Sequence, residues 1–136
     1  MPTTVATEVT PIRTSDDLVA IRHLVRISAV RIGLSLVDQT KLVTAASELT
    51  RNTLQYGGGG SMRLEVLQDG GRKGIRLTFE DHGPGIADIE LAMRDGYTSG
   101  GGLGLGLGGA KRLSNEFKID SRVGEGTRVC IVRWSR

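Results

Sequence analysis

The chain has 136 residues, a formal net charge of +3 and a single cysteine. This length suffices for one domain with its own hydrophobic core, without disulfides or a structural metal. No apolar stretch approaches the roughly 20 residues needed to cross a bilayer, and the start of the chain does not resemble a signal peptide, so we expect a cytoplasmic protein. Only 4% of the residues are aromatic, and no nucleic-acid-binding motif accompanies the charge. We therefore expect neither a nucleic acid nor a membrane as partner.

The first part of the chain predicts a strand followed by two helices. Residues 5–12 alternate loosely between polar and apolar, as a strand does. Ser15 can cap a helix that ends at Gly33. Ser35 begins a second helix that runs to Tyr56. Its apolar stripe is Leu42, Ala45, Ala46, Leu49, Thr53 and Tyr56.

The rest of the chain predicts two hairpins around a helical and glycine-rich segment. Residues 62–67 and 74–80 alternate as strands around a turn at 69–71. A short helix and a polar loop follow within residues 86–99, then a glycine run, a helix and two strands joined at 123–127. Cys130 lies in the apolar last strand, where we expect a buried, inert thiol. Strands that follow helices without βαβ alternation predict an α+β fold, a two-layer sandwich with helices on one face of the sheet.

Residues 100–109 form the most unusual segment, because seven of the ten are glycine and the other three are leucine. Glycine lets the backbone approach an anion closely, and the start of a following helix attracts negative charge, so the pattern indicates a phosphate-binding loop. A flexible linker is the alternative. Linker glycine, however, is usually mixed with serine rather than with leucine.

Three kinds of nucleotide-binding loop can be compared with this segment. A Walker A loop would end in Gly-Lys-Ser or Gly-Lys-Thr, which is absent here. Gly104, Gly106 and Gly109 have the spacing of a dinucleotide-binding loop, but no hydrophobic strand directly precedes them. The third kind is a lid that closes over ATP. Whether the segment is such a lid is decided by the other motifs of the chain.

Glu48 and Asn52 lie one turn apart at the border of the apolar stripe on the second predicted helix. A carboxylate there can be partly desolvated and act as a base, and an amide oxygen can face a metal-bound phosphate. A solvated pair at a helix edge is the simpler interpretation of these two residues alone.

Asp81 ends a predicted strand and is followed by Gly83 and Gly85, which allow a tight turn. Its carboxylate only accepts hydrogen bonds, which suits the exocyclic amine of adenine. A turn closed by the aspartate side chain explains the same pattern equally well. Residues 123–127, taken alone, predict an ordinary hairpin.

Together these segments resemble, in chain order, the N, G1, G2 and G3 boxes of the GHKL superfamily of gyrase, ninety-kilodalton heat-shock chaperones, histidine kinases and mismatch-repair ATPases. The resemblance spans roughly residues 35–130. Residues 48–53 and 95–107, with the small size, look most like the anti-sigma-type serine kinases, especially the RsbT-type switch kinases of stressosome systems. The four matching segments are Glu48-x-x-x-Asn52, Asp81-x-Gly83-x-Gly85, residues 100–109 and Gly124-x-Gly126-Thr127.

The resemblance implies a Bergerat-type ATP-binding fold, with a mixed, mostly antiparallel sheet, in a single domain of residues 1–136. It implies that Glu48 accepts the proton of the attacking hydroxyl and that Asn52 holds Mg²⁺ against the phosphates of ATP. Asp81 would recognise adenine, with Thr127 supporting it through water.

The remaining implied site residues are glycines and leucines. Gly83 and Gly85 would make room for the base. Residues 95–109 would form a lid over the nucleotide. The lid residues expected to bind nucleotide are Gly100, Gly101, Gly102, Leu103, Gly104, Leu105 and Gly106.

The implied function is a serine/threonine kinase of a partner-switching system that uses Mg²⁺ and ATP. Its substrate would be a STAS-domain antagonist protein, and its second partner a PP2C-type phosphatase or a sigma factor. The alternative is a binding module, such as an anti-sigma factor, whose nucleotide site mainly sets its conformation. The presence of both Glu48 and Asn52 favours catalysis, because a pure binding module need not retain either.

Overall fold

The computed structural model describes residues 2–94 and 106–135 of the chain. The order of its elements confirms the predicted order of strands and helices. The elements are β1 (Thr3–Ile12), α1 (Ser15–Arg31), α2 (Leu36–Gln55), β2 (Gly60–Asp69), β3 (Arg72–Asp81), α3 (Ile89–Ala92), α4 (Leu107–Arg112), β4 (Glu116–Arg122) and β5 (Gly126–Trp134).

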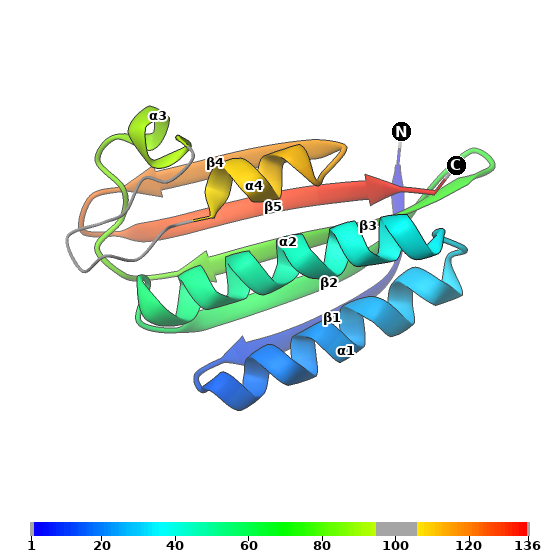
Figure 1. The fold of residues 1–136 in the computed structure, drawn as a ribbon, viewed down its shortest axis with the longest axis horizontal. Coiled ribbons are helices and arrows are strands. Elements are labelled where there is room, and N and C mark those ends of the chain that lie inside the picture. Colours follow the sequence, from blue (N-terminus) through cyan, green and yellow to red (C-terminus); the bar gives the residue numbers. More distant parts are fainter. Residues whose placement is uncertain (1, 95–105, 136) are drawn as a thin grey trace.

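The five strands form one sheet in the order β1-β2-β3-β5-β4. The sheet was expected to be mostly antiparallel, and each pair of neighbouring strands is antiparallel. The chain passes from β3 to the edge strand β4 and returns by a hairpin. This return inserts β5 between β4 and β3, antiparallel to both, and places the ends of β3 and β5 side by side (Figure 1).

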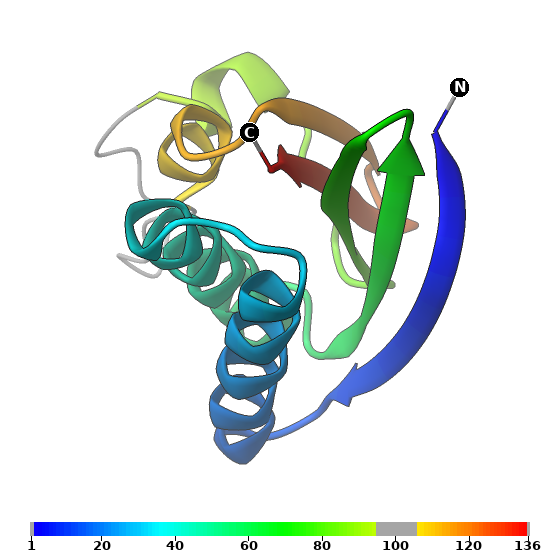
Figure 2. The ribbon, with the colours of Figure 1, turned by 90° about the vertical axis from the view of Figure 1, so that its right-hand side faces the viewer.

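The molecule has two layers, with the sheet on one side and α1, α2 and α4 on the other (Figure 2). The two layers meet in one hydrophobic core, in which α2 contributes Leu42 and Leu49 and the sheet contributes Met62, Leu77 and Phe79. Burial of each such side chain stabilises the fold by about 1.5–3 kcal/mol. The core holds α2 against the sheet. The polar edge of α2 therefore lies over the end of β3 and the beginning of β5.

The two long helices begin with different capping arrangements. Ser15, which we expected to cap α1, is instead its first helical residue, and Thr14 is the N-cap. The carboxylate of Asp17 turns back to accept hydrogen bonds from the backbone N–H groups of Arg13 (2.7 Å) and Thr14 (3.1 Å). At α2 the expectation is confirmed, because the Ser35 hydroxyl accepts a hydrogen bond from the backbone N–H of Asp38.

None of the described helices covers the opposite face of the sheet, which has its own small apolar cluster of Leu67, Val132 and Trp134. Cys130 belongs to this face, and its thiol is half-buried, with the Thr78 hydroxyl 3.7 Å from its sulfur. The expectation of a buried thiol was therefore wrong. Side chains alternate along β5, so Val129 and Ile131 enter the core and Cys130 points away from it.

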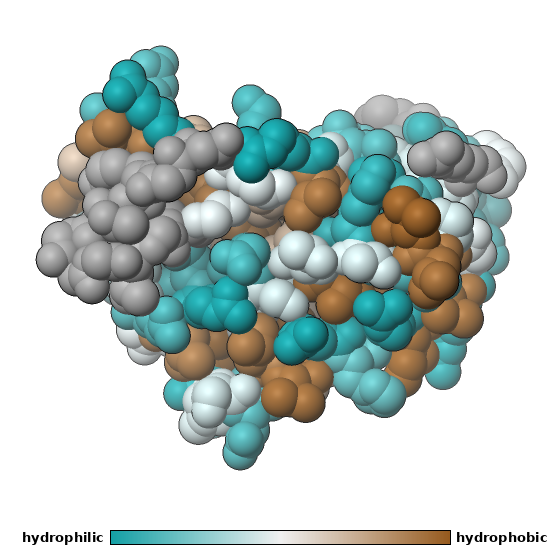
Figure 3. Space-filling model, viewed as in Figure 1, coloured by the Kyte–Doolittle hydropathy of each residue, from teal (hydrophilic) through white to brown (hydrophobic). Residues whose placement is uncertain are grey.

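The surface seen from the helical side mixes polar and apolar side chains (Figure 3). Three exposed apolar residues lie where α1 passes into α2. They are Val30, Leu36 and Val37, with exposed fractions of 56%, 72% and 62%. None of the helices in the described ranges is long and apolar enough to span a membrane.

Candidate functional site

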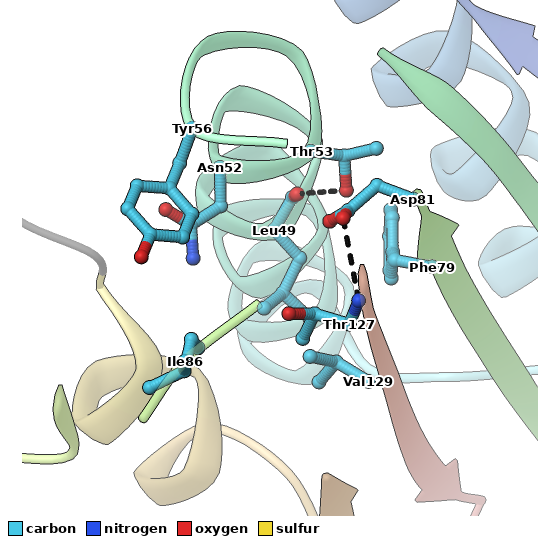
Figure 4. Close-up of a pocket in the computed structure, with 9 residues that line it drawn as sticks. All are labelled: Leu49, Asn52, Thr53, Tyr56, Phe79, Asp81, Ile86, Thr127 and Val129. Carbon is cyan, nitrogen blue, oxygen red and sulfur yellow. Dashed lines mark hydrogen bonds between the residues drawn. The ribbon is translucent and has the colours of Figure 1, made fainter. Parts of the chain in front are cut away.

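A small cavity lies between the C-terminal half of α2 and the ends of β3 and β5 (Figure 4). Its volume is about 10 Å³, which is room for about one water molecule. Three of the expected site residues, Asn52, Asp81 and Thr127, meet there. The full lining is Leu49, Asn52, Thr53, Tyr56, Phe79, Asp81, Ile86, Thr127 and Val129.

Asp81 is the last residue of β3, and Thr127 lies directly opposite it on β5. One carboxylate oxygen of Asp81, Oδ1, accepts hydrogen bonds from the backbone N–H groups of Gly83 (2.9 Å) and Thr127 (3.3 Å). The other oxygen, Oδ2, accepts no hydrogen bond from the described residues. The strand end thus fixes the carboxylate and leaves one oxygen available to a ligand.

The electrostatic surroundings of Asp81 also favour a ligand that donates a hydrogen bond. Burial raises the pKa of Asp81 above its usual range, although the two N–H donors from Gly83 and Thr127 oppose this shift. No cationic side chain of the described residues forms an ion pair with it. A carboxylate held in this way gains from any donor placed at Oδ2.

Thr127 is itself held by a residue that the sequence analysis missed. Its hydroxyl lies 2.8 Å from the hydroxyl of Ser121, the residue opposite it on β4. Ser121 also accepts a hydrogen bond from the backbone N–H of Ile86 at 2.7 Å. The signal was available, because the hairpin at 123–127 pairs position 121 with position 127.

Asn52 and Tyr56 lie one turn apart on α2 and face the same side of the helix (Figure 4). The side-chain amide of Asn52 makes no hydrogen bond with the described residues. The Tyr56 hydroxyl donates a hydrogen bond to the carbonyl of Gly85 at 2.9 Å, which ties the end of α2 to the loop after β3. Tyr56 was expected in the apolar stripe but not at the site.

Gly83 and Gly85 are both packed against backbone. A Cβ at Gly83 would lie 2.6 Å from the carbonyl oxygen of Gly57, and a Cβ at Gly85 would collide with the carbonyl of Arg122. These close approaches explain why both positions are glycine. Their expected role, making room for the adenine base, stays a prediction.

Gly57 is a site residue that was not expected from the sequence. A Cβ at this position would collide with the carboxylate of Asp81, including Oδ2. Gly57 therefore allows Asp81 to lie directly beneath the end of α2. The signal was the run of four glycines at residues 57–60, which is longer than a turn requires.

Glu48 lies one turn before Asn52 on α2 and is half-buried. Its Oε1 accepts a hydrogen bond from Nη1 of Arg51 at 2.8 Å, and the two side chains form an ion pair. Tyr56, Asn52 and Glu48 are spaced four residues apart, so they form a row about 12 Å long along the helix. The row leads from the cavity to the N-terminal end of α4.

Most of the expected lid lies outside the described residues, including Gly100, Gly101, Gly102, Leu103, Gly104 and Leu105. Gly106 is described, and it is the N-cap of α4 with φ +65°. A Cβ at Gly106 would lie 2.7 Å from Oε2 of Glu48. The structure thus brings the end of the glycine-rich segment against the expected catalytic base.

No group of three His, Cys, Asp or Glu side chains that could hold a metal ion occurs within residues 2–94 and 106–135. Mg²⁺ in nucleotide sites commonly takes few protein ligands and several phosphate and water oxygens. The neutral oxygen of the Asn52 amide fits this kind of coordination.

Comparison with known proteins agrees with this geometry. Residues 37–135 match the family described as histidine kinase-, DNA gyrase B- and HSP90-like ATPases. This range includes all of α2 except its first residue, and it includes the cavity. It also includes the seven described residues expected at the site, which are Glu48, Asn52, Asp81, Gly83, Gly85, Gly106 and Thr127. The family match therefore covers the whole candidate site.

Individual relatives show to which members of this family the chain is similar. It is 46% identical over 125 residues to the serine/threonine-protein kinase RsbT of Bacillus subtilis, covering 92% of this chain and 94% of that protein. It is 29% identical over 106 residues to an anti-sigma F factor of Anoxybacillus flavithermus, covering 73% of this chain and 71% of the other.

A solved structure shows the same fold. A crystal structure of the RsbU and RsbW domains of a Mycobacterium tuberculosis protein superimposes with a TM-score of 0.68 at 21% identity. The superposition covers 97% of this chain but only 33% of the larger chain. Together with the sequence relatives, this shows that the chain belongs to the family of histidine kinase-, DNA gyrase B- and HSP90-like ATPases, on the branch of the RsbT-type serine/threonine kinases.

Proposed function

We propose that this chain transfers the γ-phosphoryl group of ATP, with Mg²⁺, to a serine or threonine of a STAS-domain antagonist protein. The observation that carries the proposal is the pair of unpartnered polar groups in the cavity, Oδ2 of Asp81 and the side-chain amide of Asn52. Glu48 lies one helical turn beyond them. Asp81 supplies an acceptor for a base, Asn52 an oxygen for a metal and Glu48 a carboxylate for proton transfer.

Asp81 is suited to recognise adenine. Its Oδ2 would accept a hydrogen bond from the exocyclic amine, and Thr127 would support the ring through a water molecule. The cavity of about 10 Å³ is smaller than a purine, so binding requires the side chains at its mouth to separate.

Asn52 would hold Mg²⁺ against the phosphates of ATP. The metal neutralises charge on the phosphates during transfer, which is its usual role in phosphoryl transfer. The glycine-rich segment of residues 100–109 would cover the phosphates. Gly106 itself lies against Glu48, so the expected phosphate region and the base are adjacent.

Glu48 would act as general base. Its carboxylate would take the proton of the serine or threonine hydroxyl while the hydroxyl oxygen bonds to the γ-phosphorus. The bond between that phosphorus and the bridging oxygen of the β-phosphate breaks, and ADP leaves. General-base catalysis typically contributes about 10²- to 10⁴-fold in rate.

A protein partner also agrees with the surface of the molecule. Val30, Leu36 and Val37 are exposed at the junction of α1 and α2, and exposed apolar groups that gather in one place often mark protein interfaces. After phosphorylating its first partner, the chain would bind a second one, for which we propose a PP2C-type phosphatase.

The test is to incubate the chain with Mg²⁺, ATP and a candidate STAS-domain protein, and to detect phosphate on that protein by mass spectrometry. Glu48→Gln preserves the size of the side chain and removes the base. We expect transfer to fall by about 10²- to 10⁴-fold, with ATP affinity within about twofold of the wild type.

Two outcomes would contradict the kinase assignment. Equal loss of ATP affinity and of turnover in Glu48→Gln would show that Glu48 serves binding. Tight ATP binding by the wild type, without transfer to any STAS-domain protein, would favour a nucleotide-gated binding module similar to the anti-sigma F factors.

A further inference from the structure

The two carboxylate oxygens of Glu48 have different neighbours, Arg51 on one side and Gly106 on the other. Nη1 of Arg51 donates a hydrogen bond to Oε1 at 2.8 Å. Oε2 faces the backbone of Gly106, where a Cβ would lie only 2.7 Å away. The side chain of Glu48 is 40% exposed, so Oε2 can still be reached from solvent.

This arrangement decides which oxygen of Glu48 can accept a proton. Oε1 already shares a charge-assisted hydrogen bond, so its lone pairs are partly used. Oε2 has no such donor among the described residues. It is also the oxygen on the side of the glycine-rich segment.

We propose that Arg51 is a positioning residue for phosphoryl transfer, which holds Oε1 of Glu48 so that Oε2 stays directed at Gly106 and the acceptor hydroxyl. Gly106 completes the arrangement, because any side chain there would displace Oε2. The inference rests on the proposed role of Glu48 as general base. It extends that role to a residue for which nothing in the nucleotide-binding motif requires an arginine.

A purely structural role explains the Glu48–Arg51 pair poorly. Both side chains are partly exposed, Glu48 at 40% and Arg51 at 44%, and they lie three residues apart on one helix. Ion pairs of this kind add little to stability. The effect of losing Arg51 should therefore appear in catalysis and not in unfolding.

The test compares Arg51→Gln and Arg51→Lys with the wild type, in transfer from Mg²⁺ and ATP to a STAS-domain protein that the wild type phosphorylates. We expect Arg51→Gln to lower kcat about tenfold, because a misplaced catalytic group loses rate without losing substrate affinity. The KM for ATP should stay within about twofold, and Arg51→Lys should restore part of kcat. Arg72→Gln is the control for kcat, because it removes another exposed i, i+3 pair, with Asp69, together with the stacking of Arg72 on Trp134, at the far end of the sheet.

A double-mutant cycle separates positioning from direct contact with substrate. If Arg51 acts through Glu48, then Arg51→Gln should have no further effect when Glu48 is already Gln. The same tenfold loss in both backgrounds would show that Arg51 contacts the substrate itself and would overturn the inference.

Two glycine variants test the contact between Gly106 and Oε2 of Glu48. Gly106→Ala and Gly70→Ala introduce a Cβ at nearly equal backbone angles, φ +65° and +63°, but only Gly106 has Glu48 beside it. We expect both to lose similar stability and only Gly106→Ala to lose kcat.

The outcomes distinguish the two proposals. A wild-type chain that transfers no phosphate would overturn the proposed function and, with it, this inference. An active wild type with an equally active Arg51→Gln variant would overturn only the role of Arg51.

Discussion

Glu65, on the open face of the sheet, and Asp81, at the site, are equally buried, with 8% of each residue exposed. Their pKa values nevertheless shift in opposite directions. The Arg76 guanidinium, which binds Glu65 through two hydrogen bonds of 2.9 and 3.0 Å, lowers the pKa of Glu65. Burial raises the pKa of Asp81, which has only the backbone donors of Gly83 and Thr127.

A third buried carboxylate, like Glu65, is bound by an arginine side chain. Asp38 is 2% exposed, and its Oδ1 accepts a hydrogen bond of 2.6 Å from Arg133. Within the described residues, the fold thus supplies an arginine to Asp38 and to Glu65 and none to Asp81. The difference separates carboxylates that serve the fold from one that is kept available for a ligand.

The largest expected effect comes from breaking the most buried pair. Arg133→Met should lower the free energy of unfolding by about 3–5 kcal/mol, because it removes the Arg133 guanidinium from the buried Asp38 carboxylate. It also removes the hydrogen bond from Nη1 of Arg133 to the carbonyl of Leu113, the residue that follows α4. Urea unfolding measures this loss. Arg128→Met, which breaks an exposed pair with Glu80, is the control, and equal losses in the two variants would contradict the distinction.

Asp81→Asn tests the unpaired carboxylate. The amide oxygen should take the place of Oδ1, because two N–H donors converge there, and this turns the NH₂ group toward the cavity. A donor would then face the adenine amine, so ATP affinity should fall by roughly 10- to 150-fold, as expected for a lost hydrogen bond to a charged group of about 1.5–3 kcal/mol. Isothermal titration calorimetry measures the affinity for ATP. Wild-type affinity in the variant would show that Asp81 does not bind the nucleotide.

The same variant should not be less stable at neutral pH. Because folding raises the pKa of Asp81, the folded state binds its proton more tightly than the unfolded state does. The stability that Asp81 contributes is therefore complete in acid and is lost as the pH rises through its raised pKa. Relative to the wild type, Asp81→Asn should become more stable as the pH increases, and the opposite trend would contradict an unpaired Asp81.

Arg76→Met has the smallest expected effect and the opposite dependence on pH. Glu65 has a lowered pKa, so its contribution is present above its ordinary pKa and is lost as the pH falls through the folded value. The side chain of Arg76 is 34% exposed, so solvent screening should limit the loss to about 1 kcal/mol at neutral pH. The difference between the wild type and Arg76→Met should shrink in acid. A difference that stays constant with pH would show that Arg76 acts by packing alone.

Much of the fold could be predicted from hydrophobic periodicity and turn residues. The turn at Gly70 and the helix end at Gly33 are both confirmed, and both glycines have positive φ. The strands extend one to two residues further than predicted at most of their ends, because pairing with a neighbour continues past the last alternating residue. Thr14 was missed as the N-cap of α1, since Ser15 has the same capping chemistry.

The site was harder to predict than the fold. The motif residues Asn52, Asp81 and Thr127 do meet at one cavity, because β5 returns beside β3. Gly57 and Ser121 were missed because each acts through a neighbour that is distant in sequence. The exposure of Cys130 was also missed, since an apolar run does not show which face of a sheet a helix will cover.

The single tryptophan has a practical consequence for all of these measurements. Trp134 pairs with Gly74 near the beginning of β3, seven residues along the strand from Asp81, or about 23 Å away. Arg72 stacks over its ring, and its indole N–H donates to Glu116. The fluorescence of Trp134 should therefore change on unfolding but not on nucleotide binding. It can be used to measure the stability of each variant independently of its ATP affinity.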